Sequence, residues 1–414
     1  MFPRKQYLDR LVQAQGNGMI KIITGIRRCG KSFLLFTLFR NYLLEHGMDA
    51  THIIEVDLES RRNARLRNPD TLLEYIDSHI TDSNHYVVLL DEIQLVTEFE
   101  DVLNSYLKMS NVDVYVTGSN AKFLSRDVIT GFRGRGWEIR IYPLSFAEFY
   151  EYQGGDKQEA FHLYCRFGGL PQVVLMNTDE MKKDYLKTVF ETTYLRDVIE
   201  RNHLRNPEGL RTLVRVLASG IGAPTNPKRI ADTFSSTGTK MTRETILAYL
   251  TCLSDAFIIA EALRYDVKGR KYIGTETKYF FEDMGIRNVV LGFRQEEETH
   301  LMENVIYNEL RLRGYSVDVG LVESWEQSGS KRVRKNLEVD FVVNQAPKRW
   351  YIQSAYALPT REKTEQEQRA LVRIPDHFRK IIIVGDNHGG WFDSEGVEII
   401  GLYDFLLRPD ILNE

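Results

Sequence analysis

The chain has 414 residues, of which 43% are hydrophobic and 27% charged, with a formal net charge of −4 at pH 7. This length exceeds one ordinary hydrophobic core, so we expect two or three domains, and the charge excludes a protein that is basic overall. The three cysteines, Cys29, Cys165 and Cys252, lack any metal or disulfide spacing, which favours a reducing compartment. No apolar run is long enough to cross a membrane. We therefore expect a cytoplasmic protein without a membrane partner.

The first 150 residues alternate between strand-like and helix-like segments. An amphipathic helix is expected within residues 1–19, and helices are then expected at 31–46, 71–80, 98–109 and 120–129. The strands expected beside them lie at 20–24, 52–58, 86–91, 112–117 and 137–141. Strands that alternate with helices predict an α/β fold with a parallel, doubly wound sheet.

A glycine-rich loop separates the first of these strands from its helix. Residues 25–32 match the pattern Gly-x-x-x-x-Gly-Lys-Ser/Thr without a gap, in the strand–loop–helix context that this phosphate-binding pattern requires. We expect Lys31 to reach the β- and γ-phosphates of a nucleotide and Ser32 to ligate Mg²⁺. The residues expected to bind the nucleotide are those of the loop and the first helical turn: Gly25, Ile26, Arg27, Arg28, Cys29, Gly30, Lys31, Ser32 and Phe33.

Two carboxylates follow the apolar strand 86–90 directly. They stand at its carboxyl end, where open α/β sheets place their sites. We expect Asp91 to help hold Mg²⁺, through water, and Glu92 to orient the water that attacks the γ-phosphate. The alternative is an acidic pair that merely begins a helix, where the helix dipole favours negative charge.

Two further segments are candidates for catalysis. In ATPases with a separate catalytic glutamate, one strand usually lies between the strands that bear the two nucleotide motifs. Strand 112–117 fits that place, so Ser119 or Asn120 is expected to sense the γ-phosphate, or else to cap the next helix. Arg133 and Arg135 lie in a glycine-rich loop and are expected to stabilise transition-state charge in this subunit or a neighbour, with Arg135 preferred. The alternative is a turn with solvated arginines.

Taken in order, these motifs resemble a large prokaryotic family of AAA-type ATPases that carry a C-terminal region similar to restriction endonucleases. The resemblance rests on residues 25–32, 89–94, 117–120, 134–135, 142–149, 167–171, 279–285 and 338–342. It implies ATP as the nucleotide, because no local motif distinguishes ATP from GTP. It also implies four domains: an ATPase core at 1–150, a helical lid at 151–205, a winged helix at 206–292 and a degenerate nuclease-like domain at 293–414.

The region from 206 to 414 is expected to bind a partner, either DNA or a protein. The third helix of the winged-helix segment offers Arg243 as its basic residue, and the expected wing has Lys268, Arg270 and Lys271. Because this fold serves both uses, DNA binding and protein docking carry equal weight. A homo-oligomer is also compatible with the sequence.

The last 120 residues test the nuclease resemblance. A nuclease of this kind needs an Asp and, one hairpin later, Glu-x-Lys to hold Mg²⁺ and activate water. Asp340 is in place and Glu303 is a candidate helix carboxylate, but the Glu-x-Lys position contains Gln353, Ser354 and Ala355. We therefore expect a nuclease-like fold without cleavage. A basic stretch could still hold a phosphate backbone by charge, or be a solvated hairpin: Lys331, Arg332, Arg334 and Lys335.

The whole pattern predicts an ATP-hydrolysing molecular switch or motor that requires Mg²⁺. Hydrolysis is expected to change the conformation of C-terminal interaction domains. The alternative is a nucleotide-gated regulator that binds DNA or protein and hydrolyses ATP slowly and incidentally.

Overall fold

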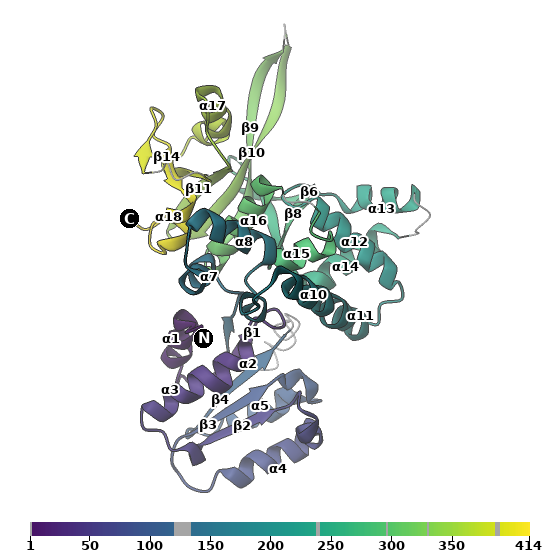
Figure 1. Ribbon diagram of the computed structural model, residues 1–414, viewed down its shortest axis with the longest axis vertical. Coiled ribbons are helices and arrows are strands. Elements are labelled where there is room, and N and C mark those ends of the chain that lie inside the picture. Colours follow the sequence, from purple (N-terminus) through teal and green to yellow (C-terminus); the bar gives the residue numbers. More distant parts are fainter. Residues whose placement is uncertain (1, 120–133, 237–240, 295–296, 329–330, 386–389) are drawn as a thin grey trace. The chain divides into compact units, whose positions relative to one another are not determined.

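The computed structural model describes residues 2–119, 134–236, 241–294, 297–328, 331–385 and 390–414 (Figure 1), without the side chains of residues 275 and 326–332. The chain divides into two compact units. The first comprises residues 1–143 with 255–257, and the second comprises residues 144–254 with 258–414.

The first unit is built on a five-stranded sheet. Its strands are β1 (Ile20–Thr24), β2 (Ile53–Asp57), β3 (Tyr86–Asp91), β4 (Val112–Gly118) and β5 (Gly136–Arg140). They are ordered β2-β3-β4-β1-β5, and every neighbouring pair is parallel. The predicted parallel α/β sheet is therefore confirmed, with β4 between the strands that precede the two nucleotide motifs. The helix expected at 120–129 lies outside the described residues.

Helices cover both faces of this sheet, because the strands carry apolar side chains on both faces. One face packs on α4 (Pro69–His79) and α5 (Phe99–Tyr106), with Val88 and Val116 among its buried residues. On the other face lie α1 (Lys5–Gln13) and a continuous helical segment made of α2 (Lys31–Phe33), η1 (Leu34–Phe39) and α3 (Arg40–Glu45). There Phe39 packs on Tyr115 with ring centroids 4.6 Å apart.

A buried ion pair between β1 and β4 lies on that second face. Lys21 donates to Asp113, and burial lowers the pKa of the Lys21 ammonium although Asp113 opposes that shift. Asp113 also accepts hydrogen bonds from the Tyr115 hydroxyl at 3.0 Å and from the Gly16 backbone N–H at 3.0 Å. The pair therefore ties the turn after α1 to the sheet.

The second unit begins with helices. The segment 144–236 contains α7 (Phe146–Gln153), α8 (Lys157–Phe167), α9 (Pro171–Val174), α10 (Asp179–Val189), η6 (Phe190–Leu195), α11 (Arg196–Arg201), α12 (Pro207–Ser219) and α13 (Pro227–Ser236). Ser145 caps α7 in a capping box with Glu148. As Figure 1 shows, α10, η6 and α11 run on as one helical segment.

A nine-stranded mixed sheet forms the rest of this unit. Its order is β13-β14-β12-β11-β10-β9-β7-β8-β6. The strands are β6 (Pro224–Thr225), β7 (Ile259–Asp266), β8 (Lys271–Phe281), β9 (Ser316–Ser328), β10 (Lys331–Gln345), β11 (Lys348–Ala355), β12 (Arg379–Val384), β13 (Trp391–Phe392) and β14 (Glu398–Gly401). The helices are α14 (Arg243–Asp255), α15 (Met284–Val290), α16 (Glu298–Leu312), α17 (Arg361–Val372) and α18 (Leu402–Leu407). Because β7 pairs with β9, the sheet spans both sides of residue 292, and the division into four domains remains a prediction.

Two of the sequence segments that carry the resemblance, 167–171 and 279–285, meet inside this unit. Asp283 caps α15 by accepting from the Ile286 N–H at 3.0 Å, and it also accepts from the Gly169 N–H at 2.7 Å. A Cβ at Gly285 would lie 2.1 Å from the carbonyl oxygen of Phe167. Burial raises the pKa of Asp283 to about 6, although its backbone hydrogen bonds oppose the shift. The end of α8 and the start of α15 therefore pack closely, and this packing requires Asp283 and Gly285.

Candidate nucleotide-binding site

The loop between β1 and α2 has the backbone of a phosphate cradle. Gly25 and Gly30 have φ angles of 146° and 102°, in the region that favours glycine, and Arg28 between them has a φ of 66°. A Cβ at Gly25 would lie 2.2 Å from the carbonyl oxygen of Ile141, so the backbone passes too close for any side chain there. The chain then enters the helical segment that begins at Lys31, whose first N–H groups are unpaired in the helix and favour an anion.

The side chains of the loop divide between its inside and its surface. Lys31 is buried, and its Nζ donates to the carbonyl oxygens of Gly25 at 3.0 Å and Ile26 at 3.2 Å, so the ammonium folds back over the loop. Cys29 is fully buried, and burial raises the pKa of its thiol. Arg27 is bound to Glu59 at 2.8 Å, and Phe33 is half-buried.

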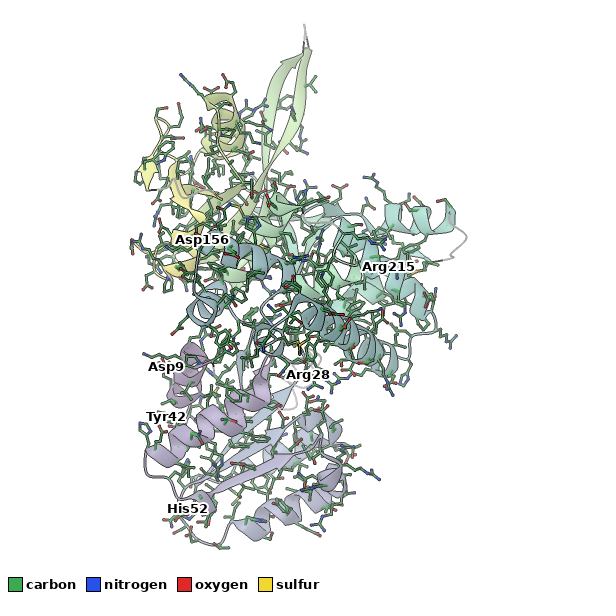
Figure 2. All side chains as sticks on the ribbon, viewed as in Figure 1. Asp9, Arg28, Tyr42, His52, Asp156 and Arg215 are labelled. Carbon is green, nitrogen blue, oxygen red and sulfur yellow. The ribbon has the colours of Figure 1, made fainter. Side chains whose placement is uncertain are left out.

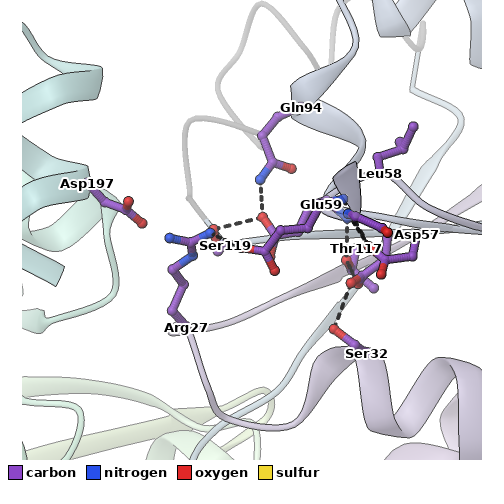
Figure 3. Close-up of polar contacts among 12 residues, drawn as sticks. Arg27, Ser32, Asp57, Leu58, Glu59, Gln94, Thr117, Ser119 and Asp197 are labelled. Atoms are coloured by element: carbon purple, nitrogen blue, oxygen red, sulfur yellow. Dashed lines mark hydrogen bonds and ion pairs between the residues drawn. The ribbon is translucent and has the colours of Figure 1, made fainter. Parts of the chain in front are cut away.

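Ser32 and Asp91 meet across the end of the sheet (Figure 3). The Ser32 hydroxyl donates to Asp91 Oδ2 at 2.8 Å, which joins the glycine-rich loop to the end of β3. Burial raises the pKa of the Asp91 carboxyl, while hydrogen bonds from Thr117 and Ser32 oppose that shift. A hydroxyl beside a carboxylate is an oxygen donor set of the kind that Mg²⁺ takes, with water and phosphate oxygens as its remaining ligands. The residues therefore fit a nucleotide with Mg²⁺.

Glu92 is held in an unusual conformation beside this pair. It is 6% exposed and has a φ of 53°, which is strained for a residue other than glycine. Its carboxylate accepts from the Ser119 hydroxyl at 3.1 Å and from the Gln94 amide (Figure 3). Strain that the surroundings hold in place is typical of functional sites. The structure thus brings Glu92 and Ser119 together, while Asn120 lies outside the described residues.

Thr117 is a site residue that the sequence analysis did not single out. Its hydroxyl donates to Asp91 and accepts from the backbone N–H of Glu92 at 2.9 Å. One side chain thereby orients the carboxylate of Asp91 and the backbone of Glu92. The signal available in the sequence was the position itself, since a polar residue at the end of the strand beside β3 must face the end of β3.

Arg135 lies at the opposite edge of the sheet. Its carbonyl oxygen accepts from the Ile20 N–H at 2.9 Å, so it stands at the start of β1, whereas the glycine-rich loop follows the end of β1. Five strand residues span about 16 Å, farther than an arginine side chain reaches. Arg135 therefore cannot touch a phosphate held by its own loop, and a contact with a neighbouring subunit stays a prediction. Arg133 lies outside the described residues.

Comparison with known proteins places the chain in a family. Residues 17–150 match the family described as "AAA domain". An uncharacterized protein of Haemophilus influenzae is 32% identical over 414 residues, which cover 99% of each chain. The chain belongs to the family of this protein. Another member, uncharacterized protein MJ1544 of Methanocaldococcus jannaschii, is 30% identical over 336 residues that cover 78% of this chain and 72% of that protein.

The fold of the chain also resembles a solved structure. The Walker-type ATPase paby2304 of Pyrococcus abyssi superposes with a TM-score of 0.50 at 18% identity, covering 70% of this chain and 96% of that one. At this identity the likeness shows the fold alone. Residues 158–297 match a family described as "Domain of unknown function (DUF8612)", so the restriction-endonuclease-like character of the C-terminal region stays a prediction. Among the described residues, no helix is both long and apolar enough to cross a membrane.

The second unit contains a buried charge cluster at the position of the expected nuclease-like site. Lys278 of β8 is 2% exposed and donates to Glu303 of α16 at 2.9 Å and to Glu338 of β10 at 2.8 Å. Asp340 of β10 lies in the same cluster and accepts from the backbone N–H of Ser354 at 2.8 Å. The structure thus brings the predicted Glu303 and Asp340 together, and it adds a lysine from another strand that sequence reasoning missed. We call these four residues the lysine–carboxylate cluster.

The charges of the lysine–carboxylate cluster set one another's ionisation. Burial alone would lower the pKa of Lys278, but the negative charges of Glu303, Asp340 and Glu338 outweigh it and raise that pKa. Burial, and next the charge of Glu303, raises the pKa of Asp340 well above its usual value. Lys278 and His300 outweigh the effect of burial on Glu303 and lower its pKa. At neutral pH the ammonium therefore faces ionised Glu303.

No set of three or more His, Cys, Asp or Glu residues with metal-binding geometry occurs in the part of the chain that the structure describes.

Proposed function

We propose that the chain binds ATP with Mg²⁺ at the loop 25–32 and hydrolyses it. The observation that supports this most is the contact at 2.8 Å between the Ser32 hydroxyl and Asp91, beside the buried Lys31 and Glu92. Lys31 would bind the β- and γ-phosphates, and Ser32 and Asp91 would hold the metal, which neutralises phosphate charge. ATP rather than GTP rests on the family resemblance.

Glu92 would orient the attacking water, because its carboxylate stands beside Asp91 and is fixed by Ser119 and Gln94. Hydrolysis changes the charge that Ser119 and Glu92 would sense at the γ-phosphate. We propose that this change is coupled to the second unit, whose residues 206–414 would bind DNA or a protein partner.

The test measures ATP binding and phosphate release by the full chain for four single variants. Lys31→Ala should abolish binding, whereas Glu92→Gln should keep binding and slow phosphate release about 100-fold or more. The matched controls, exposed Lys108→Ala and Glu74→Gln on the same unit, should change neither quantity. Normal turnover by Glu92→Gln would refute the role of Glu92, and ATP binding by Lys31→Ala would refute the site.

A second measurement separates the two versions of this function. Phosphate release is followed at fixed low salt with and without a DNA duplex and single-stranded DNA. Stimulation that Lys31→Ala abolishes would support an ATPase coupled to DNA. Saturable ATP binding with negligible turnover in every condition would instead support the nucleotide-gated regulator.

A further inference from the structure

A groove of about 710 Å³ lies in the second unit, away from the lysine–carboxylate cluster. It is lined by α10 and the start of η6, by α12, and by residues 289–294 at the end of α15. All of these elements belong to the second unit, so the groove is formed within one compact body. A helix about 10 Å wide and two turns long occupies roughly 850 Å³, so the groove is of the size that cradles two turns of a helix.

The rim of the groove is basic although the chain as a whole is acidic. Its charged lining consists of Asp184 and Glu191 and of five cations: Lys183, Lys187, Arg211, Arg215 and Arg294. Arg211 is paired with Glu191 and, at 3.4 Å, with Glu208. Within the described ranges Lys187, Arg215 and Arg294 make no ion pair or side-chain hydrogen bond. Cations along a concave, low-dielectric wall attract an acidic ligand more strongly than cations on a flat surface do.

Arg215 lies on α12 (Figure 2), next to the apolar floor of the groove, whose exposure to water is unfavourable. Val216 is 37% exposed, although a solvent-facing position on a helix is usually polar. The other apolar lining residues are Phe190, Val289, Val290, Leu291 and Phe293. The N–H of Phe293 donates to the Asn288 carbonyl oxygen at 2.8 Å, and its ring centroid lies 5.9 Å from that of Phe167, so the floor ends in an aromatic ring that packs on a second one.

We infer that this groove binds an acidic, amphipathic helical segment of a protein partner. An apolar floor between basic walls complements a helix that has one apolar face and acidic flanks. A nucleic acid would use the basic walls, but four of the six apolar lining residues are aliphatic, which leaves two aromatic rings where a single strand stacks successive bases on aromatic platforms. The inference goes beyond the proposed ATPase and does not depend on nucleotide hydrolysis.

The test uses the full chain and two fluorescent peptides. The first is a Leu–Glu helix with leucines at positions i, i+3, i+4 and i+7. The second has the same composition in an order that forms no apolar face. The chain should bind the first peptide at least about fivefold more tightly than the second, because the floor recognises the apolar face. A short DNA duplex serves as the competing ligand.

Two sets of variants locate the binding. The double variant Lys187→Glu/Arg215→Glu should lower the affinity for the first peptide about tenfold or more, since two charge attractions become repulsions. Val216→Asn should lower the affinity for the first peptide severalfold, although it leaves the charge of the groove unchanged. The matched control Lys228→Glu/Arg229→Glu reverses one exposed lysine and one exposed arginine on α13 and should have no effect. Thermal unfolding of each variant confirms that it folds.

Three outcomes would overturn the inference. Equal affinity for both peptides would mean that only charge is recognised. Loss of binding with the control variant but not with Lys187→Glu/Arg215→Glu would place the site elsewhere. Tighter binding of the DNA duplex, weakened by Lys187→Glu/Arg215→Glu, would make the groove a nucleic-acid site.

Discussion

Replacing Lys278 with methionine should destabilise the second unit strongly. Methionine fills a similar volume but leaves Glu303, whose side chain is 8% exposed, without its cation. Breaking a buried pair by removing one partner costs about 3–5 kcal/mol, because an uncompensated charge stays buried. The bond to Glu338 adds less, since that side chain is 31% exposed and water can replace the ammonium. We therefore expect Lys278→Met to lower the free energy of unfolding of this unit by about 3–5 kcal/mol.

The assay is urea unfolding followed by tryptophan fluorescence in a Trp137→Phe background. Trp137 is the only tryptophan of the first unit and is 49% exposed, so its removal leaves a signal from the second unit alone. Trp350 in that unit is 1% exposed and should report its unfolding well. The exposed Lys228→Met serves as the control and should change the free energy of unfolding by less than about 0.5 kcal/mol.

A double variant gives the refuting result. If the ammonium stabilises by neutralising Glu303, Lys278→Met combined with Glu303→Gln should cost less than the sum of the single changes, by about 2 kcal/mol. The cost of Lys278→Met should also shrink at acidic pH. The pKa of Glu303 is lowered in the folded state, so its stabilisation is present above the unfolded pKa and is lost as pH falls. A cost of Lys278→Met under about 1 kcal/mol, or strict additivity, would show that the cluster does not depend on its lysine.

Three further predictions test other contacts. Gly25→Ala should abolish nucleotide binding, because its Cβ would overlap a carbonyl oxygen at 2.2 Å, whereas Gly47→Ala, also at positive φ but with open space around its Cβ, should bind nucleotide normally. Thr117→Val should slow phosphate release about tenfold, since it removes the hydrogen-bond partner of the buried Glu92 N–H and of one oxygen of the Asp91 carboxylate, while exposed Ser105→Ala should not. Asp283→Asn should flatten the dependence of thermal stability on pH between about 4 and 6. In the wild type the folded pKa of Asp283 is about 6 and exceeds the unfolded value near 4, so the folded state holds an extra proton in this window. The free energy of unfolding of the wild type should therefore fall by up to about 3 kcal/mol as pH rises from about 4 to about 6. Parallel pH curves for wild type and Asp283→Asn would contradict that last prediction.

The first unit could be predicted well because its signals are local. The pattern of residues 25–32 requires a strand before it and a helix after it, and both are present. The apolar run 86–90 with polar ends predicts a strand buried on both faces, which β3 is. The approach of Ser32 to Asp91 then follows from topology, since the carboxyl ends of all strands in a parallel sheet lie at one edge, where β1 and β3 flank β4.

The second unit was less predictable because its chemistry depends on distant pairs. Lys278 precedes Glu303 by 25 residues and lies on a strand whose sequence signals a hairpin and no site. A buried lysine cannot be told from an exposed one in a single sequence, because its neighbours come from α16 and β10. The same holds for the groove beside α12, which forms only where α10 and the start of η6, α12 and the end of α15 come together.

The position of Arg135 follows from a rule that the sequence already contained. In a parallel sheet, residues that precede a strand and residues that follow a strand lie at opposite edges. Arg135 precedes β5, whereas residues 25–32 follow β1, and β5 pairs with β1 in register from Ile20 and Gly136 onward. Any phosphate of a nucleotide in the loop 25–32 that Arg135 contacts must therefore lie in a second copy of the chain. A catalytic arginine at this position would require an oligomer, and in a monomeric ATPase other groups, among them Lys31, Mg²⁺ and the backbone of the loop, would have to neutralise the transition state.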